Sequence, residues 1–126
     1  MVTIKSYTDI EQSKKLAKIL PLESADMWHH GFFNPSRMCK IEYNPPAPYH
    51  SVTPQWDCPC WSLPALLDIL PEELEDNHFL TLQKEKNEYC CCYEDINGNS
   101  FTHVFANNPI DACVEMIVKL HELNLL

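Results

Sequence analysis

The stretch HFLTLQKEKNEYCCCYEDINGNSFTHVFANNPIDACVEMIVKL, residues 78–120, decides the fold. It predicts strands at residues 78–84, 88–94 and 100–106, because apolar and β-branched side chains recur there between polar turns. The first turn is Glu85-Lys86-Asn87, and Asn97-Gly98 is a hairpin signal for the second. Short turns join antiparallel strands, so the sequence predicts a three-stranded antiparallel meander.

A helix is expected directly after the third strand. Asn108 is a favourable N-cap, Pro109 suits the first helical position, and Asp111 follows at the third. Apolar residues at helical spacing line one side of this segment: Ile110, Cys113, Val114, Ile117 and Leu120. The spacing predicts a helix that is deeply buried against the sheet.

Two further helices are predicted earlier in the chain. Thr8 and Glu11 have the spacing of a capping box, so a helix is expected from there to about Leu20, where Pro21 ends it. Ser62 is the expected cap of a helix over residues 63–70.

A short helical piece is also expected at about residues 22–28. Together these elements predict an α+β fold in a single domain of residues 1–126, with the meander carrying two or three helices on one face.

The middle of the chain has a different composition. Seven of the ten prolines lie between residues 34 and 64, which excludes a long helix or a central strand there. We expect residues 34–60 to form a stiff, packed loop over one side of the core. Aromatic residues in and beside it would otherwise be an exposed apolar patch, and they are the candidate binding residues: Trp28, Phe32, Phe33, Tyr49 and Trp56.

The cysteines and histidine of the same loop offer an alternative site. Cys39, His50, Cys58 and Cys60 could furnish four zinc ligands, although Cys58 and Cys60 are closer together than in a common zinc motif. The position of Cys60 near a predicted helix N-terminus would lower its pKa and make its thiol reactive. Buried packing of both cysteines is the simpler interpretation, and no cofactor is then expected.

Charge and glycine content exclude several functions. The net charge of −9 is the wrong sign for binding nucleic acid or an anionic membrane. Gly31 and Gly98 are the sole glycines, so no glycine-rich phosphate loop exists. With seven cysteines, no export signal and no long apolar stretch, the expectation is a cytoplasmic protein with free thiols.

Four blocks of the sequence occur together in a recognisable order: TDIEQSKKL at residues 8–16, ESADM at 23–27, WSLPALL at 61–67 and PIDACVEM at 109–116. In these blocks the chain resembles small proteins encoded in prophages and mobile elements of gut bacteria, a set to which no activity is assigned. The resemblance covers most of the chain except the proline-rich middle. It implies an accessory protein of a phage or integrated element, without a catalytic residue to transfer.

Two functional hypotheses follow. The first is a non-enzymatic interaction protein that binds an unidentified protein partner through the aromatic loop, because aromatic residues are the usual anchors of interfaces. The second is a small zinc-binding or reactive-thiol protein centred on the cysteines and histidine of the loop.

Overall fold

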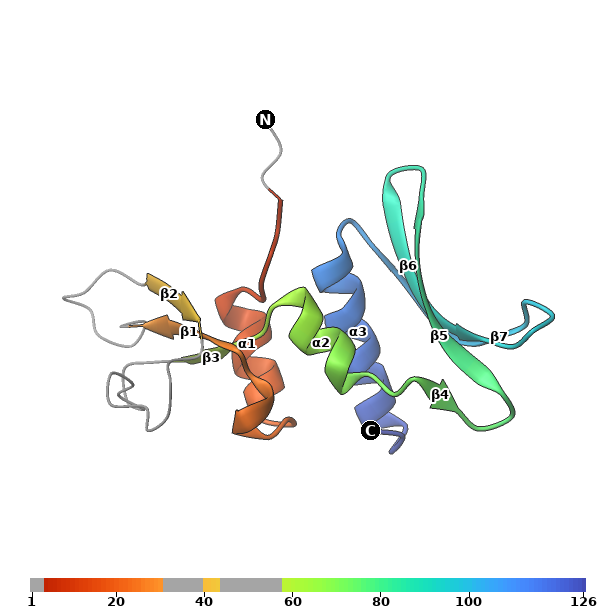
Figure 1. Cartoon of the computed structure of the whole chain (residues 1–126), viewed down its shortest axis with the longest axis horizontal. Helices are drawn as coiled ribbons and strands as arrows, with labels where there is room; N and C mark the ends of the chain where they lie inside the picture. The colour runs from red at the N-terminus through yellow and green to blue at the C-terminus, as the bar shows by residue number, and fades with distance from the viewer. Residues whose placement is uncertain (1–3, 31–39, 44–57) are drawn as a thin grey trace. The chain divides into compact units, whose positions relative to one another are not determined.

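A computed structural model of the chain describes residues 4–30, 40–43 and 58–126 (Figure 1). The described chain contains α-helices and antiparallel sheets, which confirms the α+β class. It divides into two compact units: an N-terminal unit of residues 7–65, and a C-terminal unit of residues 66–126 with residues 1–6. The boundary falls within helix α2 (Leu63–Ile69). The two units are described separately.

The C-terminal unit is built on a four-stranded sheet. Strands β4 (Glu73–Leu74), β5 (His78–Glu85), β6 (Glu88–Glu94) and β7 (Ser100–Ala106) lie in chain order, and each is antiparallel to its neighbour. The last three occupy the predicted positions within one residue, whereas β4 was not predicted. Its two residues carry no pattern of their own, and pairing with β5 makes them a strand.

The turn between β6 and β7 follows the predicted chemistry. Gly98 has a φ of +82°, a conformation that glycine adopts without strain. The carboxylate of Asp95 accepts hydrogen bonds from the backbone N–H groups of Asn97 (2.9 Å) and Asn99 (2.8 Å). These bonds hold the pKa of Asp95 below its ordinary value. Beside this turn a β-bulge interrupts the pairing of β6 with β7, where the register shifts between Tyr93 and Glu94.

Helix α3 (Pro109–Glu122) covers one face of this sheet and packs against β6 and β7. Its start is as predicted: the Asn108 side chain accepts from the Asp111 N–H at 2.8 Å and donates to the Asp111 carboxylate at 2.8 Å. The helix buries Ile110, Ala112, Cys113, Val114, Met116, Ile117 and Leu120. The sequence predicts two or three helices on one face; the described contacts place α3 there, while α1 belongs to the other unit.

The N-terminal unit contains helix α1 (Ile10–Ala17) and a three-stranded sheet. The predicted cap of α1 is wrong by one residue. The cap is Asp9, whose carboxylate accepts from the N–H of Gln12 at 2.8 Å, and the Gln12 side chain accepts from the Asp9 N–H at 3.1 Å. Thr8 is buried instead, and its hydroxyl accepts a hydrogen bond from the distant Trp61 N–H and not from the first turn of α1.

The helical piece expected at residues 22–28 is also wrong in most of its length. A single 3₁₀ turn, η1 (Leu22–Ser24), is followed by strand β1 (Met27–His30). β1 is central in its sheet and pairs with β2 (Lys40–Tyr43) and β3 (Cys58–Cys60). Two short neighbouring strands therefore override a weak local helix signal.

Strands β2 and β3 both fall inside the proline-rich segment. Pro59 is compatible with β3, because β3 is at the edge of its sheet and a proline there does not break an inner ladder. The rest of the predicted packed loop, residues 34–39 and 44–57, lies outside the described residues. None of the helices in the described ranges has the length and apolar character that a membrane-spanning segment needs.

Candidate functional site

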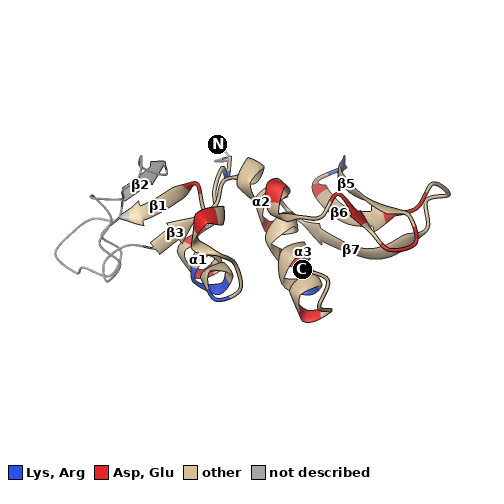
Figure 2. Cartoon of the chain, turned by 60° about the horizontal axis from the view of Figure 1, so that its bottom comes forward, with Lys and Arg blue, Asp and Glu red and all other residues tan. Residues whose placement is uncertain are grey.

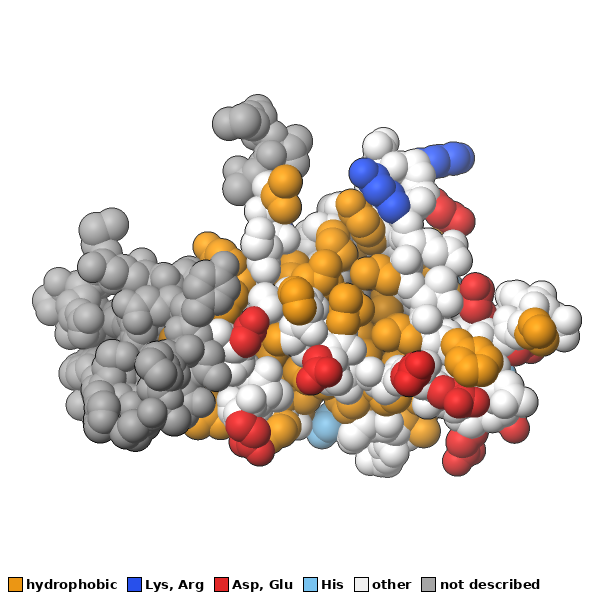
Figure 3. Space-filling view, viewed as in Figure 1, with side chains coloured by type: hydrophobic (Ala, Val, Ile, Leu, Met, Phe, Trp, Pro, Cys, Tyr) orange, Lys and Arg blue, Asp and Glu red, His pale blue; other side chains and the backbone are white. Residues whose placement is uncertain are grey.

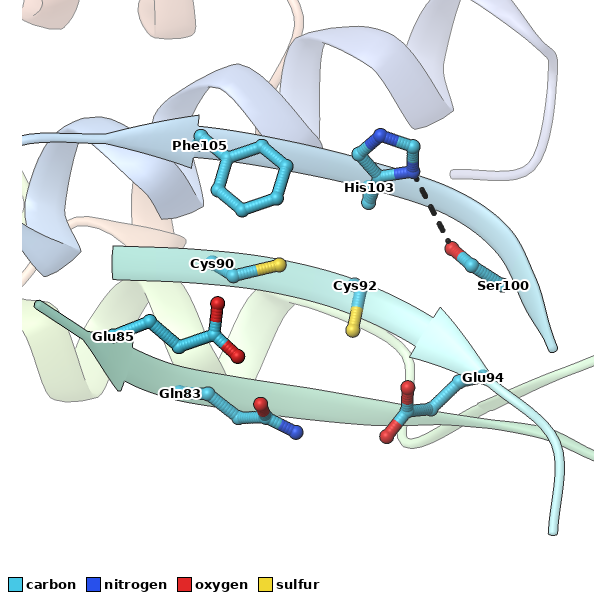
Figure 4. A pocket seen from close by; sticks show the side chains of 8 residues that line it. All are labelled: Gln83, Glu85, Cys90, Cys92, Glu94, Ser100, His103 and Phe105. Carbon is cyan, nitrogen blue, oxygen red and sulfur yellow. Dashed lines mark hydrogen bonds between the residues drawn. The ribbon is translucent and has the colours of Figure 1, made fainter. Parts of the chain in front are cut away.

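The face of the β5–β6–β7 sheet opposite α3 carries a mixed set of aromatic, acidic and thiol side chains. The register places these residues on it: Phe79, Thr81, Gln83, Glu85, Glu88, Cys90, Cys92, Glu94, Ser100, His103 and Phe105. Eight of them line a shallow hollow of about 250 Å³, and Figure 4 shows their side chains standing on the same side of three strands. We call this surface the open face.

Two phenylalanines give the open face its apolar character. Phe79 is 46% exposed and Phe105 is 49% exposed. The imidazole of His103 meets the Phe105 ring edge-on, with 5.5 Å between ring centroids. His103 also lies 3.5 Å from the hydroxyl of Ser100, which orients its ring along β7 (Figure 4).

The charges on the open face are all negative. Glu85, Glu88 and Glu94 belong to it, and the register places no Lys or Arg there. Lys84 points to the other side of the sheet, where its Nζ lies 5.6 Å from the centre of the Tyr89 ring. The red segments of the ribbon in Figure 2 mark acidic positions around this sheet, and Figure 3 shows basic side chains gathered at one end of the β5–β6 hairpin.

The thiols of the open face are held in their protonated form. Burial, followed by the charges of Cys90 and Glu94, raises the pKa of Cys92 to about 12. The pKa of Cys90 is also raised, with burial as the largest cause. Because the thiolate is the nucleophilic form of cysteine, Cys90 and Cys92 line the hollow as neutral thiols and not as a reactive pair.

On the other face, Cys91 and Cys113 contribute to the core under α3. Both are fully buried, and their thiols are hydrogen-bonded to each other. This bond and burial raise the pKa of Cys91. Tyr93 shares this face, and its hydroxyl donates to the Pro71 carbonyl at 2.7 Å. The burial of Cys113 that the helical spacing predicts is confirmed.

Of the five residues predicted to form an aromatic binding surface, the structure describes only Trp28. Trp28 is buried, with 5% of its surface exposed, so its ring is part of the core of its unit and not of an exposed patch. The other four candidate binding residues, Phe32, Phe33, Tyr49 and Trp56, lie outside the described residues. The proposed loop surface is thus represented in the structure by one buried side chain.

The candidate metal and thiol residues are likewise split. Cys58 and Cys60 are buried, while Cys39 and His50 lie outside the described residues. Within the described ranges no three His, Cys, Asp or Glu side chains gather as a metal site would require. The predicted lowering of the Cys60 pKa is wrong: burial of the thiol raises its pKa to about 11, and hydrogen bonds from Thr8 and Ser13 offset only part of that effect.

Thr8 is the centre of a buried polar cluster in the N-terminal unit. Its hydroxyl accepts from the Trp61 N–H at 3.1 Å and is hydrogen-bonded to the hydroxyl of Ser13 at 2.8 Å. Its carbonyl accepts from Nε2 of His29 at 3.0 Å, and burial lowers the pKa of that imidazole. These bonds fasten the start of α1 to β1 and β3, so the cluster has a structural role.

Comparisons with protein-family models, curated proteins and solved structures gave no match to this chain. The open face must therefore be interpreted from its own chemistry. Sequence reasoning missed it as a site, although a signal was present: His103 and Phe105 alternate with Thr102 and Val104 along β7. The register pairs them with Cys92 and Cys90 of β6.

Proposed function

We propose that the protein is a non-enzymatic protein-interaction module that binds a cationic protein segment on the open face. One observation carries the proposal: two half-exposed phenylalanines stand among three carboxylates on a sheet face without Lys or Arg. An accessory role in a phage or mobile element, which the sequence resemblance implies, is compatible with this function and stays a prediction.

The aromatic side chains support a protein partner. Phe79 and Phe105 come from β5 and β7, on either side of β6, so they can contact separate apolar groups of one ligand. Aromatic side chains that become buried on association contribute a large share of interface energy. The hollow of the open face is too small and shallow to enclose a drug-sized molecule, which favours a surface contact.

The charges define the partner further. Glu85, Glu88 and Glu94 attract a segment that carries Lys or Arg, and they repel another acidic surface. A second copy of this chain is disfavoured on this face, because the chain has a net charge of −9 and two open faces would bring like charges together.

The test is a selection of short random peptides on the immobilised full-length chain. We expect saturable binders enriched in Lys or Arg and in apolar residues. Phe105→Ser should weaken them about tenfold or more, and so should the double variant Glu85→Gln/Glu94→Gln.

Two matched controls separate the open face from general effects. Ile96→Ser removes an apolar side chain that is 94% exposed in the β6–β7 turn. Glu115→Gln/Glu122→Gln removes the same charge from exposed positions on α3. Neither should weaken binding. An absence of saturable binders, or binders that respond equally to the open-face and control variants, would refute the function.

A further inference from the structure

We infer that the partner segment binds as an additional β-strand, paired with the outer edge of β7 from Thr102 to Ala106. This inference rests on the proposed function and specifies how the cationic segment is held. It is carried by the unpaired edge of β7, which borders the open face along its length.

β7 is the last strand of its sheet, and no described strand pairs with its outer side. Exposed sheet edges are usually protected by charged side chains, proline, a bulge or a very short strand. The other edge strand, β4, is protected by having only two residues. β7 has seven residues, SFTHVFA, without a charged residue or a proline. The bulge beside Glu94 protects its beginning, so the edge from Thr102 onwards is the part open to pairing.

A contact from α3 identifies which backbone groups face outward. The Nζ of Lys119 donates to the His103 carbonyl at 3.4 Å, which indicates that this oxygen points away from β6. In an antiparallel ladder the N–H and C=O of one residue point to the same side, and every second residue does so. His103 and Phe105 therefore present their backbone groups to an incoming strand. The single long bond from Lys119 is easily exchanged for a backbone partner.

The side chains of the same two residues determine the chemistry of the partner. Those of His103 and Phe105 lie on the open face, so the residues opposite them in the added strand would extend over that face. A Lys or Arg there can lie over the Phe105 ring and reach toward the carboxylates of β6. The partner is therefore an extended segment with basic residues at alternate positions.

A second copy of the chain is the competing occupant, because two β7 edges could pair around a two-fold axis. Such pairing would join two open faces into one continuous acidic surface, with Glu85, Glu88 and Glu94 contributed by each copy. The repulsion favours a basic segment over a second copy.

The experiment uses the peptides selected on the full-length chain and measures amide hydrogen exchange by NMR. We expect the N–H groups of His103 and Phe105 to exchange about tenfold more slowly, or slower still, in the complex. Each peptide is also made in two N-methylated forms, one methylated at its odd-numbered residues and one at its even-numbered residues. One form should lose binding and the other should keep it, because only every second N–H of the added strand faces β7.

The outcomes separate the two proposals. Strand addition is refuted if peptides bind in a Phe105-dependent way while the His103 and Phe105 amides stay unprotected and the two N-methylated forms bind alike. The proposed function stands in that case. If the two amides are protected without peptide and increasingly with protein concentration, the occupant is a second copy and the inference is wrong. If no peptide binds, both proposals fail.

Discussion

Replacing Thr8 with valine should destabilise the N-terminal unit by about 2–4 kcal/mol. Thr8 is fully buried, and valine has nearly the same shape, so the change removes the hydroxyl without leaving a cavity. The buried Trp61 N–H would lose its acceptor, which costs about 1–3 kcal/mol. Loss of the 2.8 Å bond to Ser13 adds about 1 kcal/mol.

Tryptophan fluorescence measures this effect in the right unit. Trp28 and Trp61 are buried in the N-terminal unit and the C-terminal unit contains no tryptophan, so urea unfolding followed at tryptophan emission reports on the N-terminal unit. Thr8→Ser is the matched control, because it keeps the hydroxyl and loses one methyl group, at a cost of about 1 kcal/mol.

The reasoning is refuted if Thr8→Val unfolds at the wild-type urea concentration, or if Thr8→Ser is the more damaging of the two. A double-mutant cycle with Ser13→Ala adds a second criterion. Because the two hydroxyls are bonded to each other, the combined loss of stability should be smaller than the sum of the single losses.

Four further predictions concern pH (two of them), thiol reactivity and helix capping. The lowered pKa of His29 means that the folded unit binds fewer protons than the unfolded chain, so the fluorescence-detected stability should fall as the pH drops below 6.5. The pKa of Cys60 is raised to about 11, so the same stability should also fall as the pH rises above 9.0, where unfolding lets the thiol ionise. Iodoacetamide at pH 8 should label Cys60 at the rate of unfolding, and labelling as fast as in urea-unfolded protein would contradict its burial. In the C-terminal unit, Asn108→Ala should cost about 1 kcal/mol and Asn108→Gly a few tenths, measured by hydrogen exchange of α3 amides; equal losses would argue against the side-chain cap.

The sequence by itself determined the elements whose signals are local. Residues 78–120 carry their own turns, alternation and cap, so β5, β6, β7 and α3 lie where the pattern predicts them. The burial of Ile110, Cys113 and Ile117 followed from the helical spacing. Such features need only neighbouring residues, because a turn, a cap or a strand alternation is complete within a few positions.

The tertiary structure decided what depends on distant partners. Residues 27–30 are a strand because β2 and β3 pair with them, and Thr8 is a buried hydrogen-bonding centre because Trp61 lies beside it. The same reason raises the pKa of Cys60, which its position before a helix would lower. The open face also became visible here, since its residues come from three strands and a sequence does not state which side of a sheet a helix covers.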